Sequence, residues 1–456
     1  MTMFGSTIYV VCGAADMATV WKRTSELTFD AYVRDLMAQI GMSAEGMRRL
    51  LHYQEAGGSG QQEATPMVAN PSKKPFVELT GAIFKHQLQP GGAEFDRLQD
   101  RVLGWLHGAM SQDGVASAAR AGGSKGRGRG DGDGDGLIAV SLLDWIRGAM
   151  VEGVTRAFFG DALLDCIDGG LLDDFARFDD QSWKLVYRLP RPWSTPMLAA
   201  QERVKTALAR YFELPRARRA DAAWMVLAME AEMGAAGVDG RDVAASLFLT
   251  FWVINGNAWK LAFWMLAHLL FDAGLLDSVR AEVRSALADS TASSRSLCEK
   301  LASECPVLTS VYHEALRLST SSIAVRNVEQ ATIVGGKVLQ RGSRLIIPLR
   351  QILTDEDVFG ARAQSFDGLR FLRQPQLLKS PSYRPFGGGV TYCPGRFLAK
   401  NEVLTCVALA IGRFDMRVAE GDAARIPEVE GKVPCIGIMK PVDGQDVMVE
   451  LRPANQ

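Results

Sequence analysis

The sequence predicts a mainly helical protein with a minor β region. Apolar residues recur at helical spacing in several long segments, and the longest apolar stretch runs from Val243 to Phe271. Short β-like runs, separated by glycine and charged turns, occupy the stretch 323–349. The 456 residues, 47% of them hydrophobic, suffice for a large buried core. We expect a single domain over 1–456.

The N-terminal half alternates helical patterns with breaks. Between Phe95 and Met110, for example, apolar side chains recur every three or four residues and would share one helix face. The stretch 116–136 contains AGGSKGRGRGDGDGDG, which cannot bury apolar surface and predicts a flexible low-complexity insertion. The predicted segments are a strand at Ile8–Cys12, helices at Ala15–Leu27, Phe95–Met110, Ser141–Gly160 and Met197–Tyr211, and an interruption at Pro190–Pro196.

In the C-terminal half, the stretch Val243–Phe271 is long enough to span a membrane, since about 20 apolar residues suffice. Asn255, Asn257 and Lys260 in its middle favour a buried central helix instead. A second long helix is predicted at Leu297–Leu318 and a further one at Arg396–Leu409. The β-like runs are Ile323–Val328, Thr332–Val334 and Leu345–Leu349.

The composition excludes several classes of protein. A net charge of −1 gives no electrostatic reason to expect nucleic-acid binding. The seven cysteines are scattered, without the paired spacing of a zinc site or a disulfide framework, and this indicates a reducing compartment. The apolar run Ile8–Cys12 is too short for a signal-peptide core, so we expect a soluble or peripherally attached chain.

The strongest chemical signal is the run RPFGGGVTYCPGR at 384–396. It places Phe386, Gly389, Cys393 and Gly395 in the pattern F-x-x-G-x-x-x-C-x-G. A thiolate metal ligand needs a tight loop whose backbone N–H groups approach the sulfur, and glycines permit that approach. The helix that follows would direct its positive N-terminal end at the sulfur. The alternative is a buried free cysteine beside a glycine turn.

A second signal is Glu314 and Arg317 on the predicted helix Leu297–Leu318. Three-residue spacing places both side chains on one helix face. Such a pair is usually a solvated surface pair. Arg370, within the stretch FDGLRF at 366–371, could supply a second donor and so complete a buried network.

These motifs, in this order, resemble those of the cytochrome P-450 family. The resemblance implies the family fold, with haem b held between the central long helix and the cysteine loop and with Cys393 as axial ligand. It implies a single catalytic domain over 1–456. It also implies dioxygen activation with electrons from NADPH, delivered by an NADPH-cytochrome reductase. Arg384, Arg396 and Lys400 near the loop would give the reductase a basic face.

The resemblance also implies haem-binding residues beyond the cysteine loop. Arg326 matches the family position that pairs with a haem propionate. Thr391 stands where the family often has Arg or His, which leaves the second propionate contact open. Lys85 or His86 could take that role.

The central helix departs from the family pattern. Most members carry an acidic residue followed by Thr above the haem, whereas this chain has Gly256 and Asn257 or, with a one-residue shift, Asn257 and Ala258. This resembles the branch that contains prostacyclin synthase and the sterol 7α- and 12α-hydroxylases. Asn257 could hydrogen-bond iron-bound oxygen or a water, orient a substrate peroxide, or mark a helix kink without a catalytic role.

Three functions follow from the resemblance. The first is a monooxygenase of an apolar terpenoid, steroid, polyketide or fatty-acyl compound, and the second is an isomerase or lyase that rearranges a peroxide or preoxidised substrate. The third is a non-catalytic haem-binding or ligand-binding protein. The residues expected to line the substrate pocket are Phe251, Trp252, Asn255, Trp259, Ile323, Ala324, Gly437 and Ile438.

Microsomal members of the family begin with a membrane helix and a proline-rich hinge, and neither pattern is present here. We therefore expect membrane attachment that is peripheral or lost, with the cytoplasmic face of the endoplasmic reticulum as the native site. We also expect a monomer. The segment Trp183–Arg188 resembles fungal sequences, which points toward a role in secondary metabolism.

Overall fold

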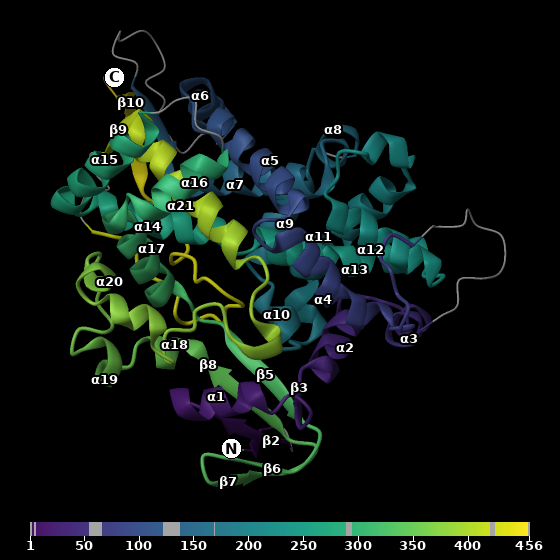
Figure 1. Cartoon of the computed structure of the whole chain (residues 1–456). Coiled ribbons are helices and arrows are strands. Elements are labelled where there is room, and N and C mark those ends of the chain that lie inside the picture. The colour runs from purple at the N-terminus through teal and green to yellow at the C-terminus, as the bar shows by residue number, and fades with distance from the viewer. Residues whose placement is uncertain are drawn as a thin grey trace. The chain divides into compact units, whose positions relative to one another are not determined.

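The computed structural model describes residues 2–3, 6–53, 66–121, 137–167, 169–288, 294–419 and 425–454. The chain divides into two compact units. Figure 1 shows its helices and strands, coloured along the sequence. Unit 1 contains residues 1–29, 103–150 and 257–456, and unit 2 contains residues 30–102 and 151–256. Helices dominate and every described strand belongs to unit 1, so the predicted mainly helical fold with a minor β region is confirmed. The single-domain assignment stays a prediction.

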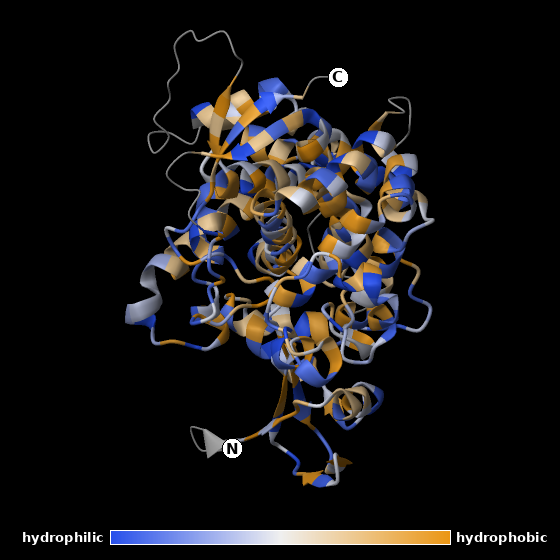
Figure 2. Ribbon diagram, turned by 90° about the vertical axis from the view of Figure 1, so that its left-hand side faces the viewer, coloured by the Kyte–Doolittle hydropathy of each residue, from blue (hydrophilic) through white to orange (hydrophobic). Residues whose placement is uncertain are grey.

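Several helices of unit 2 are amphipathic, and Figure 2 shows apolar and polar residues interspersed along the helices of the chain. Leu171, Phe175 and Phe178 lie on one face of α9 and are buried. Helix α13 begins after Asp239, whose side chain accepts from the backbone N–H of Asp242. The helices of unit 2 are α2 (Asp30–Gln39), α3 (Ala44–Leu51), α4 (Phe76–Leu88), α8 (Ala162–Cys166), α9 (Leu171–Asp179), α10 (Trp183–Val186), α11 (Arg191–Glu213), η1 (Arg216–Arg219), α12 (Trp224–Ala235) and α13 (Gly240–Asn255); α5 (Ala93–Ala109) and α7 (Leu142–Phe159) extend into both units.

Unit 1 contains three sheets. The largest has the strand order β1-β2-β8-β5-β3, in which β2 and β8 run parallel and the other pairs antiparallel. The second has the order β4-β10-β9, and β6 and β7 form a hairpin. The strands are β1 (Thr2–Met3), β2 (Ser6–Val10), β3 (Leu27–Thr28), β4 (Ile138–Ser141), β5 (Ile323–Val328), β6 (Thr332–Val334), β7 (Lys337–Leu339), β8 (Arg344–Pro348), β9 (Phe414–Val418) and β10 (Met448–Pro453).

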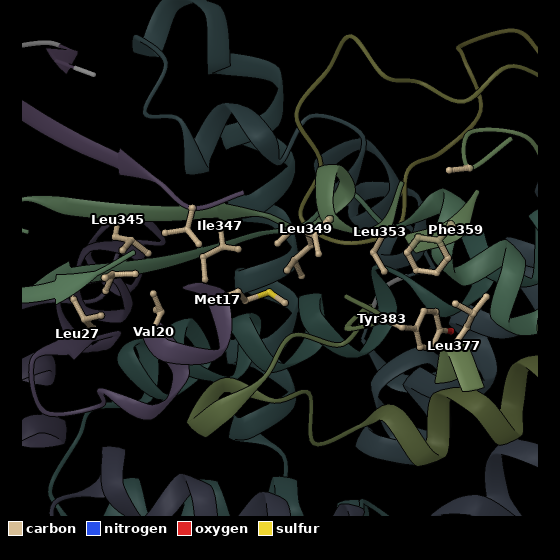
Figure 3. Close-up of a cluster of buried hydrophobic side chains, with 14 of the residues drawn as sticks. Met17, Val20, Leu27, Leu345, Ile347, Leu349, Leu353, Phe359, Leu377 and Tyr383 are labelled. Carbon is tan, nitrogen blue, oxygen red and sulfur yellow. The ribbon is translucent and has the colours of Figure 1, made fainter. Parts of the chain in front are cut away.

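Helix α1 packs on the largest sheet through a buried apolar cluster. Met17 and Val20 of α1 meet Leu345 and Ile347 of β8, and the cluster continues to Tyr383 (Figure 3). This packing fixes α1 next to the segment that carries the cysteine loop. The helices of unit 1 are α1 (Ala14–Lys22), α6 (Gln112–Ala121), α14 (Ala258–Leu270), α15 (Ala273–Leu287), α16 (Ser294–Ser303), α17 (Pro306–Ser319), α18 (Leu349–Leu353), α19 (Glu356–Phe359), α20 (Arg370–Arg373), η2 (Pro375–Lys379), η3 (Gly389–Thr391) and α21 (Arg396–Arg413).

Two helix predictions are corrected at prolines. The predicted helix Leu297–Leu318 is two helices, α16 and α17, because Pro306 lacks the N–H that would continue the first and instead begins the second. The predicted interruption at Pro190–Pro196 is wrong, since α11 already begins at Arg191. Pro192 lies in its first turn, where the backbone N–H has no partner within the helix.

Three further predicted segments end elsewhere. The predicted helix Ala15–Leu27 stops at Lys22, and Leu27 pairs with Val328 in the sheet. The predicted central helix Val243–Phe271 is broken after Asn255 into α13 and α14. Of the predicted insertion 116–136, residues 116–121 belong to α6, and 122–136 lie outside the described residues.

Within the described ranges, no single helix has the length and apolar composition needed to cross a membrane. A sharply bent pair, Gly240–Leu270 with Ala273–Leu287, meets that criterion when taken together.

Candidate functional site

The loop that carries Cys393 is a compact backbone turn closed by its own hydrogen bonds. The N–H of Cys393 donates to the carbonyl of Phe386 over 3.1 Å, and the N–H of Gly387 donates to that of Arg384 over 3.0 Å. Gly387 and Gly389 have φ angles of 75° and 61°, in the left-handed region that favours glycine. The glycines therefore let the chain reverse direction before the cysteine.

The middle glycine of the run, Gly388, is required by a contact that the sequence analysis did not identify. A Cβ atom on Gly388 would lie 2.4 Å from the ring of Trp21, and one on Gly389 would lie 3.1 Å from the Trp21 backbone oxygen. Trp21 belongs to α1, and its indole Nε1 is buried without a hydrogen-bond partner among the described residues. The α1 helix thus forms one wall of the cysteine loop.

The surroundings of Cys393 shift the pKa of its thiol in opposite directions. Burial raises the pKa of the Cys393 thiol, whereas the backbone N–H groups of Gly395 and Arg396 and the Arg396 charge lower it. Those N–H groups lie at the start of α21, where a helix presents unpaired donors. The protein thus supplies donors for a thiolate but does not by itself favour one. A bound metal cation would tip this balance, because a coordinating thiol is deprotonated.

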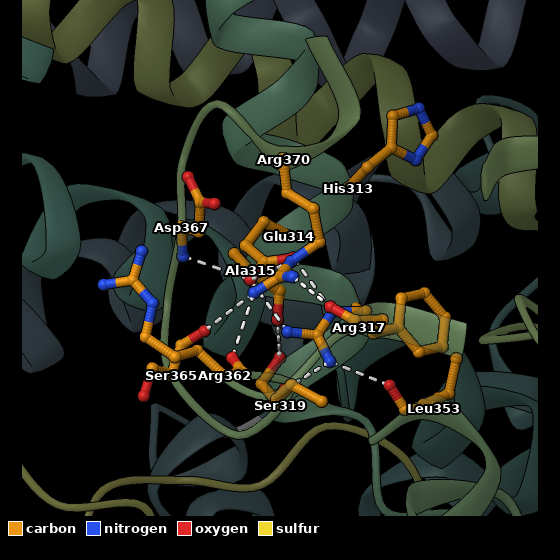
Figure 4. A network of polar contacts seen from close by, with 12 residues as sticks. His313, Glu314, Ala315, Arg317, Ser319, Leu353, Arg362, Ser365, Asp367 and Arg370 are labelled. Carbon is orange, nitrogen blue, oxygen red and sulfur yellow. Dashed lines mark hydrogen bonds and ion pairs between the residues drawn. The ribbon is translucent and has the colours of Figure 1, made fainter. Parts of the chain in front are cut away.

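Glu314, Arg317 and Arg370 form a network inside unit 1 (Figure 4). Arg317 donates two hydrogen bonds to Glu314, of 2.9 and 2.8 Å, and both side chains are fully buried. Arg370 Nε donates to both Glu314 oxygens over 3.1 Å. The structure thus brings the three predicted side chains together, in a buried arrangement rather than as a surface pair.

The remaining donors of the two arginines are used by backbone carbonyls. Arg317 Nη1 donates to Leu353 and Ala363, and Arg370 donates to Phe359, Arg362 and Ser365. Helix α17 is thereby fixed to the segment 353–370, which leads toward the cysteine loop. This network has the chemistry of a structural clamp rather than of a site that reacts with a substrate.

Arg326 is a buried cation without an anionic partner. Only 3% of the residue is exposed, and no carboxylate lies within ion-pair distance among the described residues. Its guanidinium donates to Thr391 Oγ1 over 2.6 Å and to the Val325 carbonyl, and it lies over the Phe29 ring. Burial lowers the pKa of Arg326.

This surrounding fits a haem group. A buried guanidinium needs an anion, and a haem propionate supplies one. Thr391, where the resemblance predicts a missing contact, is hydrogen-bonded to Arg326 and belongs to the same cysteine loop. The loop also exposes Val390, at 75%, and Tyr392, at 43%, apolar surface of the kind that a porphyrin would cover.

Lys85 and His86 lie in unit 2, on α4, and both are exposed. The His86 ring packs against that of Trp224 at 4.2 Å. Thr391 lies in unit 1, so neither residue shares a unit with it. The role of Lys85 or His86 in binding a haem propionate stays a prediction.

The four residues expected to line a pocket near the helix break are occupied by protein contacts. Phe251 packs against Phe159 and Phe175, and Asn255 Nδ2 donates to Thr155 Oγ1 over 3.2 Å. Trp252 Nε1 donates to Asp179, and Trp259 is 3% exposed. The open face of α13 bears Val253 instead, 59% exposed.

The other expected pocket residues meet at one place in unit 1. Ser321 N–H, just before Ile323 and Ala324, donates to the Gly437 carbonyl over 2.8 Å. Ile438 N–H donates to Asn257 Oδ1 over 2.9 Å. Ile323 is 37% exposed. Ile436, next to Gly437, is 42% exposed.

Gly256 lies just before Asn257, at the break between α13 and α14, with a φ of −83°. A Cβ atom there would approach the Trp252 carbonyl oxygen to 3.1 Å. Close packing is thus sufficient to explain the glycine.

Glu402 is a buried carboxyl group on α21, nine residues after the cysteine. It is 4% exposed, and its Oε2 has no hydrogen-bond partner among the described residues. Burial raises the pKa of Glu402 to about 8, from an ordinary value of 4.5. The folded state therefore keeps the proton at neutral pH, while the unfolded state releases it.

We expect this difference to make Glu402 lower the stability as the pH rises. Below pH 4.5 the carboxyl group is protonated in both states, so the free energy of unfolding is unaffected. Between pH 4.5 and about 8 only the unfolded state releases the proton, and the free energy of unfolding falls as the pH rises. Above pH 8 both states release it and the decrease levels off. Glu402→Gln removes the proton release, so its unfolding free energy should exceed that of the natural chain by about 4 kcal/mol at pH 8. At pH 5 the gap should be much smaller.

Urea unfolding of the haem-bound protein at pH 5 and pH 8 measures the two gaps. Glu213→Gln, at an exposed glutamate of α11, serves as the control and should show neither gap. Equal gaps for Glu402→Gln at both pH values would contradict the buried, protonated carboxyl.

Comparison with known proteins agrees with this site. The family model described as Cytochrome P450 matches residues 261–441. The chain is 29% identical over 264 residues to "Cytochrome P450 monooxygenase poxD" of Penicillium oxalicum, covering 56% of this chain and 53% of that protein. It is 31% identical over 236 residues to human "Prostacyclin synthase", covering 48% and 47%. It is 33% identical over 192 residues to "Cytochrome P450 monooxygenase calL" of Penicillium decumbens, covering 39% and 36%.

The matched part spans about half or less of the length of these relatives. The family match contains the Glu314–Arg317–Arg370 network and the whole cysteine loop. The predominance of helices with small sheets agrees with the family fold. Residues 261–441 of the chain thus match the cytochrome P450 family, and the cysteine loop closed by Trp21 and the buried guanidinium beside it agree with that match.

Proposed function

We propose that the chain is a haem-thiolate monooxygenase that oxidises an apolar small molecule. The observation that carries the proposal is the cysteine loop, where backbone N–H groups reach Cys393 and Thr391 accepts from Arg326, a buried cation without a carboxylate partner among the described residues. Cys393 would ligate the iron of haem b, and Arg326 with Thr391 would hold a propionate. Two of the fungal relatives carry the name monooxygenase. The substrate could be of terpenoid, steroid, polyketide or fatty-acyl type, and a role in fungal secondary metabolism would accord with these relatives.

The haem would supply dioxygen activation, with the balance R–H + O₂ + NADPH + H⁺ → R–OH + H₂O + NADP⁺. The residues of the chain supply the surroundings. The N–H groups of Gly395 and Arg396 would stabilise negative charge on the Cys393 sulfur. Asn257, half-buried at the start of α14, has two amide N–H groups that can donate to a ligand or to a water. It cannot release a proton as a carboxylic acid does.

Apolar surface supports the substrate class. Ile323 and Ile436 are partly exposed beside the place where the 435–439 segment meets Ser321. Val253, in unit 2, is an exposed apolar residue on a largely buried helix. Such side chains favour an apolar ligand with few polar groups.

We also propose an NADPH-cytochrome reductase as partner and the endoplasmic reticulum as native site. A basic face is the expected docking surface, and Arg384, Arg396 and Lys400 lie near the cysteine. Two of them also serve the loop itself, since Arg384 donates to the Ser380 and Tyr383 carbonyls and Arg396 to that of Cys393. Burial lowers the pKa of Lys400.

A second candidate is an isomerase that rearranges a peroxide without NADPH. The observation that favours it is Asn257, which stands in place of the acid and alcohol usual in the family. The similarity to "Prostacyclin synthase" supports it as well. In this reaction the Asn257 amide would orient a peroxide oxygen of the substrate rather than assist proton delivery.

One experiment separates the candidates. The haem-bound protein is given a sesquiterpene, a sterol, a C16 fatty acid and a fatty-acid hydroperoxide under ¹⁸O₂, with and without NADPH and reductase. A monooxygenase incorporates one ¹⁸O atom only when NADPH and reductase are present. An isomerase converts the hydroperoxide without either and incorporates no ¹⁸O. Binding spectra without turnover of any compound would contradict both and leave a ligand-binding protein.

A further inference from the structure

The segment Cys435–Met439 is held in place by contacts with three other parts of unit 1. Its backbone exchanges hydrogen bonds with residues 319–321, from Met439 N–H to the Ser319 carbonyl and from Ser321 N–H to the Gly437 carbonyl, both 2.8 Å. Trp264 Nε1, on α14, donates to the Met439 carbonyl over 2.7 Å. The last contact is from Ile438 N–H to Asn257 Oδ1.

The contact with Asn257 requires the glycine that precedes Ile438. A Cβ atom on Gly437 would lie 2.0 Å from Asn257 Oδ1 and 2.6 Å from its side-chain carbon. No residue with a Cβ atom could occupy position 437 while Asn257 keeps its position. The backbone of the segment therefore lies directly against the Asn257 amide.

Asn257 does not use its side chain in the way its position suggests. It is the N-cap residue of α14, where an asparagine usually accepts a hydrogen bond from its own helix. Here the side chain makes no such bond, although the Asn257 carbonyl accepts from Lys260 and Leu261 N–H. The helix thus lacks a local side-chain cap, and the oxygen instead accepts from a residue 181 positions away in the sequence.

The bond to Ile438 also fixes which way the amide points. An N–H donor must face the amide oxygen, so Oδ1 is assigned to Ile438 and Nδ2 is left on the other side. Nδ2 makes no hydrogen bond to a described protein atom, and Asn257 is half-buried rather than enclosed. The amide is therefore available to a ligand only as a donor.

We propose that Asn257 is a positioning residue that determines specificity by fixing the 435–439 segment, and that this bond presents its Nδ2 as a donor. The exposed Ile436 lies on the segment so fixed, and Ile323 lies three residues after Thr320, which forms an isolated β-bridge with Ile438. A change at Asn257 should therefore alter the shape of the apolar surface. The effect on specificity rests on the function proposed above, whereas the effect on the segment does not.

Amide hydrogen–deuterium exchange of the haem-bound protein tests the positioning. In Asn257→Ala, the exchange rate of the Ile438 amide should rise on the order of 5–10-fold, because the hydrogen bond from Ile438 N–H to the side chain of residue 257 is lost. Asn257→Asp keeps an oxygen acceptor of the same shape and should keep the protection. Exchange in the helix that contains Glu314 should stay unchanged in both variants and reports that they fold.

Binding of two probes to the haem tests specificity. Imidazole is small and depends little on the surrounding segment, whereas clotrimazole is bulky and must fit against it. Asn257→Ala should change the clotrimazole Kd at least about fivefold relative to that of imidazole. Trp264→Phe removes another tether of the same segment while Asn257 stays, and it should change the same ratio in the same direction.

Three results would overturn the proposal. Equal Ile438 exchange in the natural chain and Asn257→Ala would show that Asn257 does not hold the segment. Faster exchange without a change in the ratio of the two dissociation constants would remove the role in specificity. A change of that ratio in Asn257→Ala but not in Trp264→Phe would assign the effect to direct contact. None of these measurements requires turnover, so a failure of the proposed activity remains distinguishable.

Discussion

Replacing Cys393 by serine should abolish the thiolate-type absorption band of the reduced, carbon-monoxide-bound haem protein. A serine hydroxyl is a much weaker ligand than a thiolate, and the N–H groups of Gly395 and Arg396 would then face a neutral oxygen. The difference spectrum of the purified protein, normalised to folded chain, measures the effect. We expect loss of the band and of any turnover that depends on it.

Cys435→Ser is a matched control for this experiment. Cys435 is partly buried like Cys393, and its sulfur accepts a hydrogen bond from Gly437 N–H, but it lies outside the cysteine loop. The Cys435→Ser variant should keep the band. A band that persists in Cys393→Ser, with haem bound and the chain folded, would remove the axial-ligand assignment and every mechanism built on it.

The parts of the site that the sequence predicts are local in the chain. The cysteine loop is defined by thirteen successive residues, 384–396, in which glycine, cysteine and proline each have a specific backbone role. Glu314 and Arg317 are three residues apart, so helical geometry alone places them on one face. Arg370 is the exception, predicted because the pair needed a further buried donor, and the structure places it there.

The contacts that the sequence does not reveal join distant segments. Trp21 packs on Gly388 because α1 is fixed to the sheet by Met17 and Val20, and nothing near Trp21 in the sequence indicates that neighbour. The contact of Asn257 with Ile438 is similar. Neither position could be paired with its partner from residue type or spacing.

The sequence also could not predict which face of helix α13 is exposed to solvent, for a different reason. Helix α13 is apolar on all sides, so the 3.6-residue period does not indicate which side is packed. Phe251 and Trp252 were expected to line the substrate pocket, yet they form the buried side. Val253, a smaller residue, stays exposed.

Replacing Arg317 by lysine should destabilise the protein by about 2–4 kcal/mol, because buried hydrogen-bond acceptors lose their donors. Lysine keeps the charge but cannot donate in two directions to Glu314 while also reaching the Leu353 and Ala363 carbonyls. Urea unfolding and the haem content of purified protein measure the result. Arg373→Lys, at the exposed pair with Asp367, should change stability by less than about 1 kcal/mol.

A second variant shows whether the effect belongs to a pair or to a network. In a simple buried pair, replacing both partners by apolar residues often recovers stability, because no charge is left unpaired. Here Glu314→Leu with Arg317→Met would leave Arg370 buried, at 6% exposure, without its only carboxylate among the described residues. The double variant should therefore be no more stable than Arg317→Lys. Recovery to the stability of the natural chain would show that Arg370 contributes nothing and that Glu314 and Arg317 act as an isolated pair.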